Sequence, residues 1–250
     1  MSRTVRSAST VVLLRDGLDG LETLLMRRVA SMAFAPRMHV FPGGRVDDVD
    51  FSVAVTFMGG DVEAMAQRAS ADVSELRALY SCAIRETREE VGVDLVHPTC
   101  DDGLLVDPDA LPLIDHWVTP EGETRRYDVR FFAAMVTGDD ARLTTTEADT
   151  VVWMQPASAL AAFAAGDLPM LPPTESVLRW LTGFATAPEA LVAGALRDVV
   201  PLLPRRVEGD PGEGGSARWV LTHDRTGEVL VDPVVAPHTR ESDGLPRGDS

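Results

Sequence analysis

Three glutamates stand close together in the segment CAIRETREEVGV, residues 82–93: Glu86, Glu89 and Glu90. On a helix, with about 100° of rotation per residue, their carboxylates share one stripe about 100° wide. Glu86 has like-charged neighbours three and four positions on, and each such pair costs roughly 0.2–0.5 kcal/mol. Carboxylates grouped at this cost suit a hard divalent cation, Mg²⁺ or Mn²⁺. A solvated charged surface is the alternative, and spacing alone does not decide between the two.

The helix that would carry these glutamates is predicted over residues 74–91. Core-facing positions recur on it about one turn apart, at Leu76, Tyr80, Ala83, Thr87 and Val91. The glutamate stripe lies beside this face, where the wall of a cleft would be. We expect the Thr87 hydroxyl to bond back to the carbonyl of Ala83, and Gly92 to end the helix.

Other parts of the chain predict a mixed sheet with helices packed on its faces. Two apolar runs, STVVLLRD and LETLLMRRV, read as a hairpin, and a short strand in MHVFPGG should end at Pro42-Gly43-Gly44. Further strands are expected in YDVRFFAAMVT and TVVWMQP, helices in PASALAAFAAG and TESVLRWLTGFA, and a C-terminal hairpin turning near residues 225–227. The fold class is therefore α/β (α+β), with the helices on both faces of the sheet.

The length of 250 residues suits one domain, which we place at residues 1–235. Residues 50–73 have mixed character, with a helix expected in VEAMAQRAS, and residues 236–250 have too little apolar content to fold.

Composition excludes several classes of function. The formal net charge is −16, which disfavours nucleic acid and anionic membranes as partners. All 23 basic residues are arginine, so mechanisms that need a lysine are excluded. Two cysteines make no disulfide framework, the five histidines show no zinc-ligand spacing, and we see no membrane span. We expect a soluble cytoplasmic protein; its oligomeric state stays open, with a homodimer as one option.

The segment Arg85-Glu86-x-x-Glu89-Glu90-x-Gly92 resembles the second half of the Nudix box, and FPGG (residues 41–44) stands upstream as it does in that superfamily. The box usually opens with a glycine and, after five residues, a glutamate. Gly44 is the best match for the glycine, Asp50 then holds the position of the glutamate, and an insertion separates both from Arg85. The resemblance implies a Nudix-type α/β/α sandwich with a mixed central sheet, an insertion and C-terminal helices.

The inserted layout, together with LLMRR, FAPRMHVFPGGRVDD and LPPT, resembles the branch that contains coenzyme A diphosphatases. It implies Mg²⁺-dependent (or Mn²⁺-dependent) hydrolysis of coenzyme A or acyl-CoA to a phosphopantetheine product and adenosine 3′,5′-bisphosphate. Hydrolysis of ADP-ribose, a dinucleotide or a nucleotide sugar is the second hypothesis. A non-catalytic Nudix-fold ligand sensor is the third.

The resemblance also implies roles for single residues. Glu89 and Glu90 would carry metal, Glu86 would support the attacking water or a metal, and the carbonyl of Gly44 would complete the shell. Arg85 would orient Glu89.

Further candidates come from loops. Glu147 is a candidate loop carboxylate for the metal, with Asp149 as its rival and a solvated loop acid as the alternative. Arg125 and Arg126, and likewise Arg27 and Arg28, are candidates for holding phosphate, against the simpler reading of solvated side chains.

Overall fold

A computed structural model describes residues 5–32, 35–96, 103–137, 141–207, 218–223 and 229–234. The predicted tail at residues 236–250, the hairpin turn at 225–227 and Cys100 lie outside these ranges.

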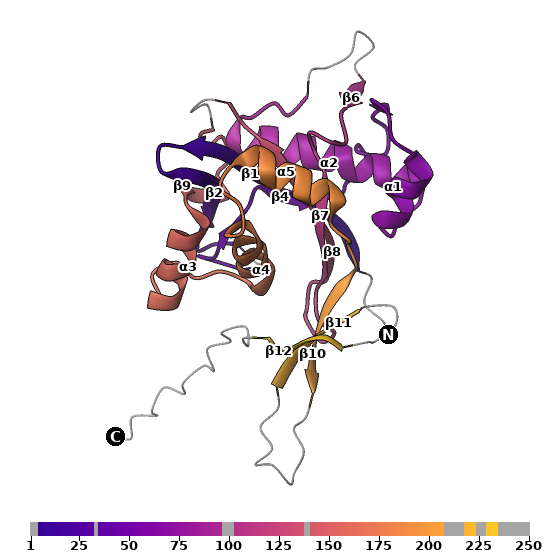
Figure 1. Cartoon of the computed structure of the whole chain (residues 1–250). Helices are drawn as coiled ribbons and strands as arrows, with labels where there is room; N and C mark the ends of the chain where they lie inside the picture. Colours follow the sequence, from indigo (N-terminus) through magenta and orange to yellow (C-terminus); the bar gives the residue numbers. More distant parts are fainter. Residues whose placement is uncertain are drawn as a thin grey trace, which may run out of the picture.

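One mixed sheet organises the molecule, with the strand order β12-β11-β10-β7-β8-β1-β2-β3 (Figure 1). The long central strand β1 (Arg6–Gly17) runs antiparallel to β2 (Gly20–Arg28) and parallel to β8 (Tyr127–Met135). The predicted hairpin and the strand over 127–135 are thereby confirmed. The remaining strands of this sheet are β3 (His39–Val40), β4 (Gly43–Arg45) beside β1, β7 (Leu113–Val118), β9 (Ala148–Met154) beside β2, β10 (Leu202–Val207), β11 (Arg218–His223) and β12 (Val229–Val234).

Helices cover both faces of the sheet, as predicted. The alternation of β1 shows why, because Val11 and Leu13 join the apolar core under one group of helices while Val12 and Leu14 join the core under the other. The first core is shared with α1 (Val62–Arg68) and α2 (Val73–Val91). The second is shared with α3 (Pro156–Ala165), α4 (Pro172–Leu181) and α5 (Ala187–Leu196). The result is an α/β/α sandwich, and none of the described helices is long and apolar enough to span a membrane.

Helix α2 begins and ends close to the positions that the sequence predicts. The Asp72 carboxylate accepts a hydrogen bond from the amide of Glu75 at the N-terminus. Gly92 ends the helix in the left-handed conformation, with φ of 69°. The Thr87 hydroxyl donates to the carbonyl of Ala83 at 2.7 Å, so this buried residue satisfies its own polar group.

The segment at residues 50–73 forms a small unit beside α2. It contains β5 (Val55–Phe57), which pairs in parallel with β6 (Leu104–Val106), and the expected helix α1. Arg68, in the last turn of α1, donates hydrogen bonds to the carbonyls of Gly194 and Arg197 at the end of α5. This segment is thus joined to the end of α5 as well as packed beside α2.

Two details differ from the sequence-based expectations. The Gly43-Gly44 segment does not simply end a strand, because it forms β4 and pairs with Ser9 and Thr10 of β1. The helix α5 was not predicted: its sequence APEALVAGAL is apolar on nearly every side, which hides the helical period, although Thr186 and Glu189 form a capping box at its start.

Gly43→Ala is expected to destabilise the fold by on the order of 3 kcal/mol. A Cβ at Gly43 would lie 2.3 Å from the backbone oxygen of Ser9, and backbone cannot yield as a flexible side chain can. Urea unfolding measures the effect. Gly183→Ala is the control, since the nearest atom to its Cβ would be 3.4 Å away. Equal midpoints for both variants would show that β4 is not held tightly against β1.

Candidate metal and diphosphate site

Glu90, near the C-terminus of α2, is buried at 5% exposure beside the Gly43 strand. The amide of Gly43 donates to its Oε2 at 2.8 Å. Burial raises the pKa of the Glu90 carboxyl to about 8, and the nearby Glu86 and Glu147 act in the same direction. A cation bound beside this carboxylate would favour its charged form.

Glu86 lies against Gly44, so close that a Cβ at Gly44 would come within 2.4 Å of the carboxyl group. Burial also raises the pKa of Glu86. A larger residue at Gly44 would therefore displace the Glu86 carboxylate from the β4 backbone. The carbonyl of Gly44 accepts from the Cys82 thiol at 3.5 Å, and burial, with Asp50 and Glu86 adding to it, raises the pKa of Cys82 to about 12.

Arg85 holds the acidic cluster together. Its Nη1 donates to Glu86 at 2.7 Å and to Glu89 at 3.2 Å. Its Nε and Nη2 donate to the two oxygens of Asp50 at 3.0 and 2.8 Å, which is a bidentate pair. Asp50 is 1% exposed and is the most completely buried carboxylate that pairs with Arg85. Asp50, which follows β4, is thus joined to Arg85 of α2.

The described residues contain no set of three acidic, histidine or cysteine side chains already arranged to hold a metal ion. The reason lies in the contacts just given, since Arg85 draws Glu86 and Glu89 while Glu90 turns to the Gly43 amide. The donor chemistry nonetheless fits Mg²⁺ or Mn²⁺, because two buried or half-buried carboxylates with raised pKa values stand beside an exposed third, Glu89.

The three glutamates open into a cavity of about 670 Å³ on the α3–α4 face of the sheet. Its floor comes from alternating positions of neighbouring strands, Thr10 and Ala8 of β1 and Phe131 and Val129 of β8. Gly43, Gly44, Glu86, Glu89 and Glu90 line it together. None of residues 51–73 is among the described residues that line it, so the small unit beside α2 contributes no wall to this cavity.

The two candidate loop acids differ in their position relative to the cavity. Glu147 lines it and lies 4.0 Å from Arg28 Nη2, whereas Asp149 pairs with Arg27 at 2.7 Å outside it. Arg28 lines the cavity, so its guanidinium lies next to the space that a ligand would occupy. Glu147 is therefore better placed than Asp149 to hold a metal, and Arg28 is better placed than Arg27 to contact a phosphate.

Arg125 and Arg126 also differ. Arg125 lines the cavity, while Arg126 directs its Nε to the carbonyl of Thr119 at 3.0 Å. Neither Arg126 nor Arg27 is among the described residues that line the cavity, so a phosphate contact from either has no geometric support. Sequence reasoning assigned no role to the apolar lining residues, although FAPRMHVFPGGRVDD contributes Met38, Val40 and Phe41, and LPPT contributes Leu171 to Thr174.

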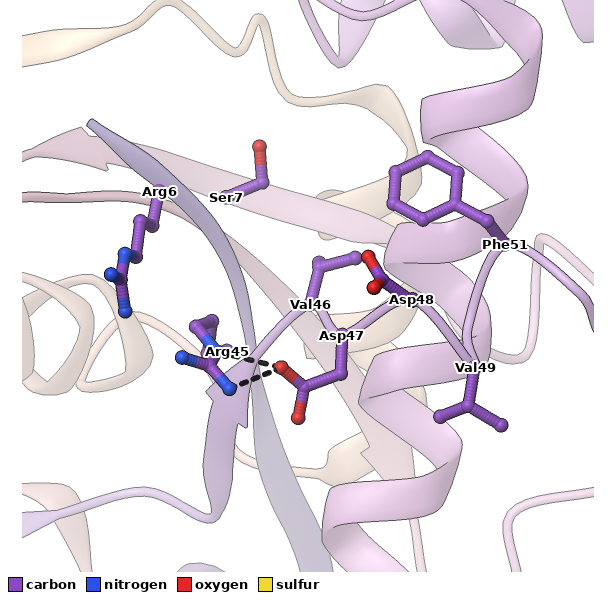
Figure 2. A pocket seen from close by; sticks show the side chains of 8 residues that line it. All are labelled: Arg6, Ser7, Arg45, Val46, Asp47, Asp48, Val49 and Phe51. Atoms are coloured by element: carbon purple, nitrogen blue, oxygen red, sulfur yellow. Dashed lines mark hydrogen bonds and ion pairs between the residues drawn. The ribbon is translucent and has the colours of Figure 1, made fainter. Parts of the chain in front are cut away.

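A second hollow adjoins the site at Arg45, which lines both (Figure 2). The guanidinium of Arg45 is paired there with Asp47 through its Nε at 2.7 Å. The other lining residues are Arg6, Ser7, Val46, Asp48, Val49 and Phe51. Because its carboxylates offset its arginines, this hollow has no clear preference for an anion.

Comparison with known proteins identifies a family and several similar structures. The model of the NUDIX domain matches residues 4–174. A NUDIX hydrolase from Alicyclobacillus acidocaldarius is 27% identical, with a TM-score of 0.60 over 77% of this chain and 97% of that one. The NUDIX domain of Shewanella oneidensis NrtR, in complex with ADP-ribose, is 12% identical, with a TM-score of 0.47 over 72% and 88%. A C. elegans Ap4A hydrolase complex is 20% identical, with a TM-score of 0.42 over 72% and 100%.

The chain belongs to the Nudix family, since the family model covers more than half of it. It is a Nudix hydrolase that acts on pyrophosphate bonds, and the family generally acts on nucleoside diphosphate derivatives with a divalent metal such as Mg²⁺. The α/β/α fold and the cluster of Glu86, Glu89 and Glu90 beside a glycine turn are consistent with that membership.

Proposed function

We propose that this hydrolase cleaves the diphosphate of coenzyme A or acyl-CoA, giving a phosphopantetheine product and adenosine 3′,5′-bisphosphate. One observation carries the proposal most directly: a single cavity joins the acidic cluster and three arginines to a broad apolar wall. Such a cavity suits a substrate with a diphosphate in the middle and chemically unlike ends. The arrangement of the inserted Nudix box supports the same branch.

Mg²⁺ or Mn²⁺ would be held by the carboxylates of Glu86, Glu89, Glu90 and Glu147 and by the Gly44 carbonyl. The bound cation would neutralise the diphosphate and lower the pKa of water there. Arg28 and Arg125 line the cavity and would bind phosphate oxygens. Arg85 would act as a positioning residue, because it contacts Glu86 and Glu89.

A substrate panel tests this function. The protein would be incubated with Mg²⁺ or Mn²⁺ and with coenzyme A, acyl-CoA, ADP-ribose, NADH and UDP-sugars, and the products identified by mass. We expect adenosine 3′,5′-bisphosphate from the CoA compounds and loss of turnover in Glu89→Gln. This variant suits the purpose because Glu89 has an exposed side chain, 59% by area, so its replacement should not unfold the helix.

Two results would contradict the proposal in different ways. Turnover of ADP-ribose or a dinucleotide far above that of coenzyme A would keep the chemistry and exclude the substrate. Absence of turnover for every diphosphate would support a ligand sensor instead.

A further inference from the structure

The cavity has a wall that metal and phosphate binding leave unused. Six apolar side chains form it, and we call them the methionine wall: Met32, Met38, Phe41, Phe163, Met170 and Leu171. They come from the flanks of β3, from α3, and from the segment before α4.

Backbone hydrogen bonds fix where the wall stands. The amide of His39 donates to the carbonyl of Pro169 at 2.8 Å, and His39 also forms a β-bridge with Met170. The amide of Arg28 donates to the carbonyl of Met38 at 3.0 Å. Phe41 and Met170 are buried at 3% and 6% exposure, while Met38 is half-buried. The wall is therefore rigid in its backbone and adaptable only in its methionine side chains.

The chemistry of the wall selects among ligand groups. None of its six side chains carries an N–H or O–H group. A sugar hydroxyl or a base edge placed against it would lose its hydrogen bonds to water without replacement. An aliphatic chain makes no hydrogen bonds to water, so it loses none when it lies against the wall. The methionine side chains are unbranched and polarisable, and they can adapt to chains of different length.

We propose, on the basis of the function proposed above, that the methionine wall binds the acyl chain of an acyl-CoA. The chain would reach the wall through the pantetheine arm while the diphosphate lies at the glutamates. The enzyme should then prefer acyl-CoA thioesters to free coenzyme A, with the preference growing with chain length until the wall is covered.

A chain-length series tests the inference on the intact protein. The values of kcat/KM with Mg²⁺ would be measured for coenzyme A, acetyl-CoA and octanoyl-CoA. Burying one methylene can improve kcat/KM by up to about fourfold, so octanoyl-CoA should exceed coenzyme A by at least about tenfold. The gain should lie mainly in KM, because the wall does not touch the reacting bond.

The variant Met38→Gln tests whether the chain-length preference arises at the methionine wall. It should lower the octanoyl-CoA to coenzyme A preference by about tenfold, since a half-buried wall residue becomes polar. Met58→Gln is the matched control, because Met58 is 54% exposed and not among the described residues of the cavity. If Met38→Gln fails to fold, the wild-type chain-length series still decides.

Equal kcat/KM for the three compounds, or an unchanged preference in Met38→Gln, would overturn the wall as an acyl subsite while leaving the diphosphatase function in place. Turnover of ADP-ribose without turnover of any CoA compound would overturn both proposals, so the two failures are distinguishable.

Discussion

Glu90→Gln is expected to lower kcat/KM by about 10²- to 10³-fold while leaving the protein folded. The magnitude is that found when one preorganised electrostatic group is removed from an active site. The amide oxygen of glutamine can still accept from the Gly43 amide, which is 2.8 Å from the carboxylate oxygen. The change therefore removes a charge and keeps the contact, so lost activity would report on the charge.

The stability of the metal-free protein should respond to pH through the same residue. The folded pKa of Glu90 is about 8, above the ordinary value of 4.5, so between these pH values the folded state binds more protons than the unfolded state. The free energy of unfolding should then be highest below pH 4.5 as far as this group is concerned, and should fall as pH rises towards 8. In Glu90→Gln that part of the fall should be absent.

Thermal melts with EDTA, at pH values from 5 to 8.5, measure this contribution, and added Mg²⁺ at pH 8 should stabilise the wild type more than the variant. Glu63→Gln serves as the control, because Glu63 is an exposed acid in the first turn of α1. If Glu90→Gln kept full activity, or gained as much stability from Mg²⁺ as the wild type, Glu90 would not be a metal ligand.

The helix that carries the glutamates could be predicted well because its signals are local. The apolar period, the Asp72 cap and the Gly92 end all act within a few residues, and the structure has α2 at Val73–Val91. The position of the carboxylates at the edge of the buried face follows from the same period. The burial of Glu90 could not be predicted in this way. It depends on the packing of α2 against β4, and Gly43 of that strand lies 47 residues before Glu90 in the sequence.

The choice between neighbouring arginines shows the same limit. Arg125 and Arg126 are equivalent in the sequence, yet only Arg125 lines the cavity, since Arg126 bonds the Thr119 carbonyl across the β7–β8 connection. Both residues lie in the connection before β8, where no strand alternation indicates which side chain faces the cavity. The sequence does not reveal the path of this connection, nor which distant acid meets Arg85.

Asp50→Asn is expected to destabilise the protein by about 3 kcal/mol, because it removes the most deeply buried carboxylate that pairs with Arg85 and leaves the guanidinium with fewer acceptors. The carboxylate of Asp50 accepts from Arg85 at 2.8 and 3.0 Å, from the Asp47 amide at 2.9 Å and from the Ser81 hydroxyl at 3.3 Å. Asparagine would turn an N–H group towards the guanidinium. The loop that follows β4 would lose its anchor on α2 at the same time.

The same change should raise the Mg²⁺ concentration for half-maximal activity by about 10- to 100-fold, the range found when a group supporting a metal ligand is lost. Released from Asp50, the Arg85 charge is shared only by Glu86 and Glu89, and it then competes more strongly with the cation for them. Activity as a function of Mg²⁺ concentration measures this effect, with Asp48→Asn as the control on the exposed part of the same loop.

A double-mutant cycle separates an effect through Arg85 from general damage to the fold. If Asp50 acts through Arg85, the double variant Asp50→Asn with Arg85→Gln should need no more Mg²⁺ than Arg85→Gln alone. Strictly additive effects would show that Asp50 serves the loop and not the glutamates. Asp50→Glu should recover much of the Mg²⁺ affinity, because it restores the charge opposite Arg85 at the position where the Nudix box usually has glutamate.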